Sequence, residues 1–366
     1  MGASKRQSED TATPVFGLTR AQLLPIVENV AGEPVAWFDL SIEHEPAPEH
    51  YGGRGEKAIP TFGYRTRRGR VGRATVFAKR HCNIGPNEAL HYEWLTKHGA
   101  PSPRIYGAIS GAEVRDIVFI EYIEPFLGDE EELLRDDDVL AQFLSVTARF
   151  NAIRPCAEYA GKLPCKLAWM GFDRLAPTLE RFWERAARGE AGEEVKRLCS
   201  EDELERLAEL AGRVTEPIAR MKQALSHWDH RPHNVGWRRQ TGEMVIFDLE
   251  DTMMGPRFDD LADWLGAPDE AQQRSRPREE LAACYLEQLE RWGGAPAQVG
   301  EFLEETRVLW MLHALGGLDW WLRYGGVLDG CETPAGKNPA VHRCRNRAKL
   351  WRELHGLMGA AASWMQ

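Results

Sequence analysis

The chain changes character near residue 124, and this change limits the folds that it can adopt. Before that point, five segments rich in β-branched and aromatic residues are typical of strands, and a helical segment, 87–99, follows the third of them. After that point, apolar residues recur at steps of three and four over most of the chain, which predicts helices. The five strand-like segments are 34–44, 61–67, 74–81, 104–110 and 116–123.

This pattern predicts an α+β protein with two lobes. We expect a flexible tail over 1–14, a small β-rich lobe over 15–123 and a larger, mainly helical lobe over 124–366. A short strand-rich insert near 224–251 interrupts the helical lobe, and it carries the residues with the clearest chemical pattern.

Composition excludes several classes of protein. The chain carries 46 Lys and Arg against 56 Asp and Glu, and the resulting net charge of −10 disfavours nucleic acid as a partner. No stretch approaches the roughly 18 apolar residues of a membrane span, and the N-terminus lacks the apolar core of a secretory signal. The seven cysteines are scattered without a Cys-x-x-Cys pair, which favours free thiols in a reducing compartment. We therefore expect a cytoplasmic protein that does not bind membranes.

The most informative motif lies in the strand-rich insert. His227, Asp229 and Asn234 follow the pattern H-x-D-x-x-x-x-N, and a predicted hairpin then leads to Asp248 at the end of an apolar strand. Phosphoryl transfer depends on groups that position the reactants and stabilise charge. The carboxylate of Asp229 can orient an attacking hydroxyl and accept its proton. The amide oxygen of Asn234 and the carboxylate of Asp248 are hard ligands that suit Mg²⁺ on nucleotide phosphates.

These residues resemble the catalytic core of the aminoglycoside phosphotransferase and choline kinase-like family. That family typically shows H-G-D-x-x-x-x-N, a hairpin, an apolar residue with Asp, and a G-P…D-L-A run. Here the run Gly-Pro-Arg-Phe-Asp-Asp-Leu-Ala stands at 255–262, at a fitting distance. Trp228 replaces the usual glycine, which makes the loop bulkier but leaves Asp229 in register.

The resemblance implies a bilobal protein-kinase-like fold and an ATP- and Mg²⁺-dependent phosphotransferase. The γ-phosphate would pass to a hydroxyl group of an aminoglycoside-, amino-alcohol- or sugar-like small molecule. Asp229 would be the catalytic base, and Asn234 and Asp248 would ligate Mg²⁺.

The same resemblance requires nucleotide contacts in the small lobe. Lys79, at the end of a predicted strand, would bind the α- and β-phosphates, although an isolated lysine there would otherwise be an edge residue. Its partner would be Glu88, preferred over Glu93 because Glu88 shares a helix face with apolar residues. The resemblance also implies a glycine-rich loop that binds phosphate and a hinge whose backbone binds adenine. The glycine-rich segment could instead be an ordinary turn, and the hinge segment could instead be an ordinary core strand. Their residues are Gly52, Gly53 and Gly55 for the loop, and Glu121, Tyr122 and Ile123 for the hinge.

Three alternatives to an active small-molecule kinase follow from the same residues. A zinc site at His227, His230 and His233 is disfavoured because no other His or Cys completes a known spacing. His227 is better interpreted as a structural residue, and His230 and His233 as exposed or substrate-facing. A nucleotide-binding pseudokinase is disfavoured because every polar catalytic position is filled. A protein kinase is disfavoured because no A-P-E follows Asp248 and the next motif begins too soon for an activation loop.

The acceptor is the least determined part of the prediction. The segment 308–324 is rich in aromatic residues, and its helical face could line an acceptor pocket or simply pack in the core. Aromatic rings with a carboxylate would suit a cationic acceptor, and they suit a sugar ring nearly as well. The candidate residues are Trp310, Asp319 and Trp320.

Overall fold

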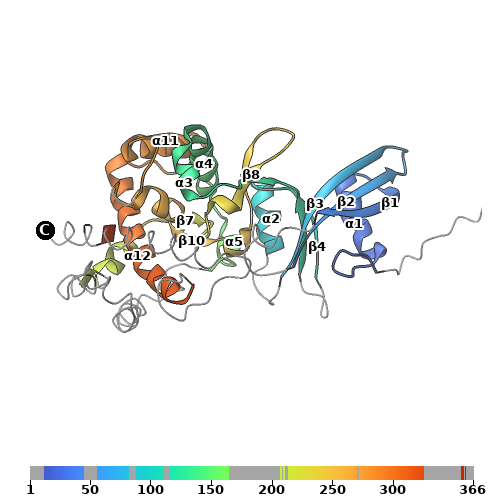
Figure 1. The fold of residues 1–366 in the computed structure, drawn as a ribbon, viewed down its shortest axis with the longest axis horizontal. Helices are drawn as coiled ribbons and strands as arrows, with labels where there is room; N and C mark the ends of the chain where they lie inside the picture. The colour runs from blue at the N-terminus through green and yellow to red at the C-terminus, as the bar shows by residue number, and fades with distance from the viewer. Residues whose placement is uncertain are drawn as a thin grey trace, which may run out of the picture. The chain divides into compact units, whose positions relative to one another are not determined.

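The computed structural model describes residues 12–44, 56–81, 88–110, 116–164, 207, 209–210, 213–269, 272–324, 356–357 and 359, with side chains up to 316 in the 272–324 segment. The chain forms two compact units. The first consists of Met1–Leu127 and His233–Asp251, and the second of Gly128–Pro232 and Thr252–Gln366. The first unit ends near the expected lobe boundary, but it also takes in the hairpin segment that we expected in the helical lobe. Figure 1 shows the elements of both units.

The first unit is built on a five-stranded sheet with the order β1-β2-β3-β5-β4, in which all neighbouring strands are antiparallel. Its helix α2, Glu88–Lys97, follows β3 in the chain, as predicted. The strands are β1 Val35–His44, β2 Glu56–Thr66, β3 Val71–Arg80, β4 Ile105–Ile109 and β5 Ile117–Glu121.

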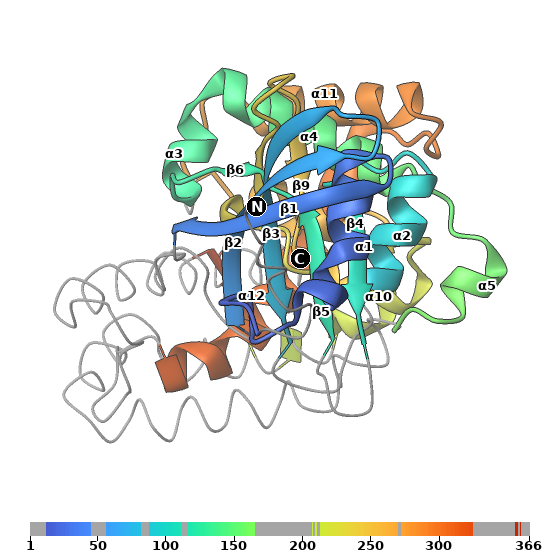
Figure 2. The ribbon, with the colours of Figure 1, turned by 90° about the vertical axis from the view of Figure 1, so that its right-hand side faces the viewer.

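Helix α1, Arg20–Ala31, packs against this sheet (Figure 2). Thr19 caps the helix in a capping box with Gln22, and Gly32 ends it in the left-handed conformation that favours glycine. Gly107 on β4 allows the close approach, because a Cβ there would lie 2.6 Å from the Cδ1 atom of Ile26. The core beneath the helix includes Phe38, Phe62 and Phe119 among its buried residues.

A second, three-stranded sheet in the first unit carries the motif residues. It has the order β6-β8-β9, with β6 Glu124–Pro125, β8 Val235–Trp237 and β9 Met244–Ile246. The short 3₁₀ turns η2, Pro232–Asn234, and η3, Leu249–Asp251, stand before β8 and after β9. The backbone amide of Phe247 donates a hydrogen bond to the carbonyl of Asn234 at 2.9 Å. The hairpin therefore brings the two ends of the motif together.

The second unit is mainly helical and also holds one small sheet, in which β7 Gln223–Ser226 pairs antiparallel with β10 Met253–Pro256. Two short helical turns, η4 Asp259–Leu261 and η5 Ala262–Gly266, follow β10. Together with the first unit, this confirms the predicted α+β class. The helices are α3 Glu130–Arg135, α4 Asp137–Asn151, α5 Ala157–Ala160, α10 Thr215–Arg220, α11 Arg278–Arg291 and α12 Val299–Tyr324.

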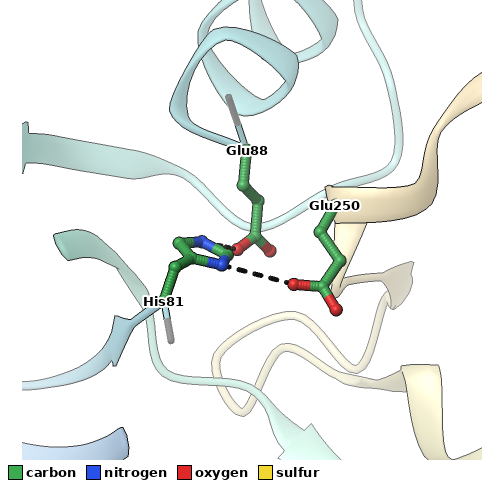
Figure 3. A group of neighbouring side chains, drawn as sticks. All are labelled: His81, Glu88 and Glu250. Atoms are coloured by element: carbon green, nitrogen blue, oxygen red, sulfur yellow. Dashed lines mark ion pairs between the residues drawn. The ribbon is translucent and has the colours of Figure 1, made fainter. Parts of the chain in front are cut away.

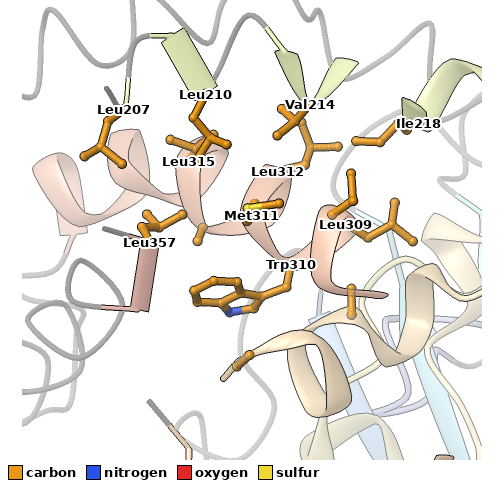
Figure 4. Close-up of a cluster of buried hydrophobic side chains, with 14 residues drawn as sticks. Leu207, Leu210, Val214, Ile218, Leu309, Trp310, Met311, Leu312, Leu315 and Leu357 are labelled. Atoms are coloured by element: carbon orange, nitrogen blue, oxygen red, sulfur yellow. The ribbon is translucent and has the colours of Figure 1, made fainter. Parts of the chain in front are cut away.

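The core of the second unit gathers around α12. Figure 4 shows Leu309, Met311 and Leu312 of this helix with Val214 and Ile218, and all five are at most 1% exposed. Among the residues that the structure describes, no helix has the length and apolar character needed to cross a membrane.

Candidate active site

Lys79 lies near the end of β3 with its ammonium group among three carboxylates. The Nζ atom contacts the carboxylate of Asp248, and it lies 2.8 Å from Glu250 Oε2 and 3.3 Å from Glu88 Oε2. The Lys79 side chain is only 5% exposed. Burial lowers the pKa of Lys79, but the charges of Glu88, Asp248 and Glu250 outweigh it and raise the pKa well above its usual value. The structure thus brings together Lys79, Glu88 and Asp248, as the sequence predicts.

Asp248 follows the apolar strand β9 in an unusual backbone conformation. Its φ is 63°, in the left-handed region that few non-glycine residues adopt. The Asp248 amide donates a hydrogen bond to the hydroxyl of Tyr92 on α2 at 3.0 Å. Such a strained conformation persists when the surroundings fix it, and it is common at functional sites.

A pocket opens beside these residues within the first unit. Its lining includes the apolar side chains of Phe77, Val118 and Ile120 from the central strands. It also includes the polar side chains of Lys57, Lys79, Asn234 and Asp248. Ligand pockets commonly combine apolar walls with a few convergent polar groups. The full lining is Lys57, Phe77, Lys79, Glu88, Tyr92, Val118, Ile120, His233, Asn234, Phe247 and Asp248.

His81 stands beside the lysine network (Figure 3). Its Nε2 atom lies 2.8 Å from Glu88 Oε2, and its Nδ1 atom lies 3.3 Å from Glu250 Oε2. Burial lowers the pKa of His81, but the two carboxylates outweigh it and raise the pKa to about 9. Burial raises the pKa of Glu250, yet His81 and Lys79 outweigh it and lower the pKa to about 2. The two carboxylates therefore favour the protonated, cationic form of the imidazole.

Two sets of residues could hold a metal ion. His81, Glu88 and Glu250 offer ligand atoms within 4.8 Å of one another. The Lys79 ammonium contacts both of those carboxylates, so this group is better described as an ion-pair network. Asn234 and Asp248 instead line the pocket and offer an amide and a carboxylate oxygen, the hard donors that Mg²⁺ prefers.

Asp229 lies in the second unit, in the loop after β7. Its side chain is 44% exposed, and its Oδ1 atom lies 3.9 Å from Nε of Arg231. Arg231 also pairs with Asp263 at 2.6 Å and with Glu130 at 3.2 Å. One guanidinium therefore contacts three carboxylates, and all of them are at least partly open to solvent.

Trp228 has a φ of 72°, in the left-handed region. The family usually has glycine at this position, and the backbone explains why, since glycine adopts this conformation without steric cost. The loop holds the conformation here through Asp260, whose Oδ1 accepts a hydrogen bond from the Trp228 amide at 3.1 Å.

The three histidines of the motif differ in environment. His227 is fully buried, as expected of a structural residue. The expectation that His230 is exposed or substrate-facing is wrong. Its ring stacks on Phe143 with centroids 4.4 Å apart, and its Nε2 atom lies 2.6 Å from the Thr147 hydroxyl. Burial lowers its pKa well below the usual value. His233 is exposed and lines the pocket.

The remaining predicted residues fall outside the pocket lining or outside the described residues. Glu121 ends β5 and pairs with Arg238 at 3.0 Å, and Ile123 is buried. The glycines of the expected phosphate loop, Gly52, Gly53 and Gly55, lie outside the described residues, as do the side chains of Asp319 and Trp320. Trp310 is 4% exposed within the core of the second unit, in agreement with the core-packing alternative (Figure 4).

Sequence reasoning missed three residues of the site. Lys57 is the direct cross-strand partner of Lys79, so the two side chains share one face of the sheet. His81 stands two residues after Lys79, which in an extended chain returns to that face. Glu250 stands two residues after Asp248. Alternation along β3 could have found His81, whereas Glu250 depends on the 3₁₀ turn η3.

Comparisons with known proteins identify the family of the chain and its fold. Residues 85–302 match the APH phosphotransferase enzyme family. An ethanolamine kinase of Plasmodium vivax is similar in fold, with a TM-score of 0.50 and 12% identity, over 94% of this chain and 92% of that one. A search of curated protein sequences finds no match.

Two further solved structures are similar at lower scores. A spectinomycin phosphotransferase in complex with ADP and spectinomycin has 10% identity and a TM-score of 0.47, over 94% of this chain and 97% of its own. A thermostable mutant of aminoglycoside phosphotransferase APH(4)-Ia, in complex with AMP-PNP and hygromycin B, has 10% identity and a TM-score of 0.46. That similarity covers 93% of this chain and 98% of the mutant's chain.

The fold and the family match define a phosphotransferase with a kinase-like fold. The chain belongs to the APH phosphotransferase enzyme family, and it is a small-molecule kinase whose acceptor is a hydroxyl group.

Proposed function

We propose that this kinase transfers the γ-phosphate of ATP, with Mg²⁺, to a hydroxyl group of a small molecule. The observation that carries the proposal is the pocket in the first unit, which is lined both by apolar strand residues and by Lys79, Asn234 and Asp248. An apolar wall suits a nucleobase, and a lysine beside two oxygen ligands suits its phosphates and their metal ion.

In the proposed reaction, the acceptor oxygen forms a bond to the γ-phosphorus while the bond to the bridging oxygen of ADP breaks. Asp229 accepts the proton of the acceptor hydroxyl. Lys79 donates hydrogen bonds to the α- and β-phosphates, and Glu88 holds it in place. When bound, Mg²⁺ neutralises phosphate charge, and the donor set of Asn234 and Asp248 fits it.

Two further nucleotide contacts complete the proposal. The backbone of Glu121, Tyr122 and Ile123 would hydrogen-bond adenine. The backbone amides of Gly52, Gly53 and Gly55 would contact phosphate. Both contacts rest on the position of these residues in the family pattern.

We propose a cationic acceptor as the first class to test. The carboxylates of Asp229, Glu130 and Asp263 gather around the single guanidinium of Arg231, which favours amines in this region. The net charge of −10 of the whole chain also favours a cationic acceptor. Asp319 and Trp320 remain candidates for acceptor contacts, whereas the burial of Trp310 favours a core role.

The cellular setting is part of the same proposal. Use of ATP and scattered cysteines favour a cytoplasmic enzyme, and an acidic chain disfavours nucleic acid as a partner.

The test is phosphate transfer by the purified full-length protein. It would be incubated with ATP and Mg²⁺ and with a panel of aminoglycosides, amino alcohols and sugars, and phosphorylated products would be detected by mass spectrometry. We expect product with at least one amine-bearing acceptor, and none with EDTA or with Asp229→Asn. ATP binding without product from any acceptor would favour the pseudokinase alternative.

A further inference from the structure

The contacts of Lys79 with carboxylates leave its ammonium group no free donor for a nucleotide phosphate. An ammonium group has three hydrogen-bond donors, and here it contacts the three carboxylates of Glu88, Asp248 and Glu250. To donate to a nucleotide phosphate, Lys79 must give up at least part of one of these contacts. The side chain of Glu88 is only 2% exposed, and a buried carboxylate left without a cation is costly.

His81 lies where its imidazole can neutralise the buried carboxylate of Glu88. Figure 3 shows its imidazole facing both Glu88 and Glu250, with one ring nitrogen directed to each carboxylate. The 2.8 Å contact of His81 with Glu88 is shorter than the 3.3 Å contact of Lys79 with the same oxygen. The imidazole thus contacts the same two carboxylates as the lysine, but it approaches them from another position on the chain.

The local fold fixes this arrangement. His81 directly follows β3, and its backbone amide donates a hydrogen bond to the carbonyl of Asp116 at 3.1 Å. Its side chain is 6% exposed, so the ring is held by protein rather than by solvent. Glu88 is the first residue of α2, and Glu250 lies in η3. One imidazole therefore links three separate elements of the first unit around Lys79.

Charge counting gives the same result. With His81 protonated, the three cations Lys57, Lys79 and His81 balance the charge of the three carboxylates. With a neutral side chain at position 81, two lysines would face three carboxylates, and the excess negative charge would hold Lys79 and repel phosphate.

We propose that His81 is a positioning residue that acts as a second counter-ion for Glu88 and Glu250, so that Lys79 can bind nucleotide phosphate. His81 does not contact the nucleotide itself. It shares the neutralisation of the two carboxylates with Lys79 when the lysine also donates to the phosphate oxygens. The inference rests on the proposed function, because it requires that Lys79 binds a nucleotide.

The experiment measures binding of MgADP to the full-length protein by calorimetry, with His81→Gln, His81→Lys and the control His98→Gln. His98 is an exposed histidine just after α2. We expect His81→Gln to weaken MgADP binding about tenfold, the effect of losing a cationic partner of a buried carboxylate. His81→Lys restores a cation and should bind within about threefold of the wild type. His98→Gln should bind as the wild type does.

The outcomes separate this inference from the proposed function. If the wild type does not bind MgADP, the proposed function fails. If the wild type binds and a folded His81→Gln binds equally well, the inference about His81 is wrong. Should His81→Gln fail to fold, His81→Lys carries the test, and a loss greater than tenfold in a folded His81→Lys overturns the inference.

Discussion

The carboxylate of Asp260 accepts a hydrogen bond from the backbone amide of His227 at 3.0 Å, two residues before Asp229. The same carboxylate accepts hydrogen bonds from the Trp228 amide, at 3.1 Å, and from the side chains of Ser226 and Asn151, both at 2.8 Å. Asp260 belongs to the run at 255–262, so this part of the motif braces the loop that carries the proposed base.

Asp260→Ala should therefore destabilise the protein by about 2–4 kcal/mol, because it leaves several buried donors unpaired. Chemical denaturation measures the change. Asp138→Ala, at an exposed position on α4, should change stability by less than about 0.5 kcal/mol. Equal stabilities of the two variants would mean that Asp260 does not brace the loop.

Asp229→Asn should lower kcat by a factor of about 100 to 10,000, because orientation of the hydroxyl and acceptance of its proton are lost. MgADP affinity should stay within about twofold, since we place Asp229 at the acceptor and not at the nucleotide. Steady-state kinetics and calorimetry give the two values. Near-normal turnover would remove Asp229 from the proposed mechanism.

Glu88→Gln should raise KM for MgATP by about tenfold, because Lys79 and His81 both lose a buried carboxylate partner. Glu93 is exposed on the same helix, and Glu93→Gln should leave KM unchanged. The matched pair tests the helix phase. A larger effect from Glu93 than from Glu88 would contradict the assignment.

His81 should make the stability of the protein depend on pH. Its pKa is raised in the folded state from 6.5 to about 9, so its stabilising contribution is complete below about pH 6.5 and is lost as the pH rises through about 9. The stability difference between the wild type and His81→Gln should therefore shrink over this range. Denaturation curves at several pH values would show it, and a constant difference would mean that folding does not raise the pKa of His81.

Trp310→Ala should cost about 3–5 kcal/mol, the usual penalty for deleting a large aromatic side chain from a core. Trp310→Phe, which keeps most of the volume, should cost much less. If Trp310→Ala were instead stable and changed only KM for the acceptor, the residue would line the acceptor site.

The sequence predicted those parts of the fold that depend on local pattern. The helical segment predicted at 87–99 is observed as α2, and the strand-like segment 74–81 placed Lys79 on β3. The choice of Glu88 over Glu93 as the partner of Lys79 followed from a local argument, the phase of α2, whereas the pairing itself was implied by the family resemblance. The roles assigned to these residues remain predictions.

The errors and omissions arise where distant segments decide the environment. Nothing near His230 indicates that its ring will stack on Phe143, a residue of α4 far earlier in the chain. Glu250 reaches Lys79 only because η3 turns it back toward β3. The charged neighbours of His230 in the sequence, Asp229 and Arg231, favour an exposed position. Its burial depends on tertiary packing against Phe143, which the sequence near His230 does not indicate.

The chain passes from one compact unit to the other three times, after Leu127, Pro232 and Asp251. On the ribosome, Lys79 and Glu88 are therefore synthesised well before Asp248 and Glu250, the carboxylates that complete their network. A nascent chain that ends between residues 121 and 251 contains the five-stranded sheet but lacks part of the unit to which that sheet belongs. Completion of the first unit must wait until most of the chain has been translated, and N-terminal fragments should be targets for chaperones and proteases.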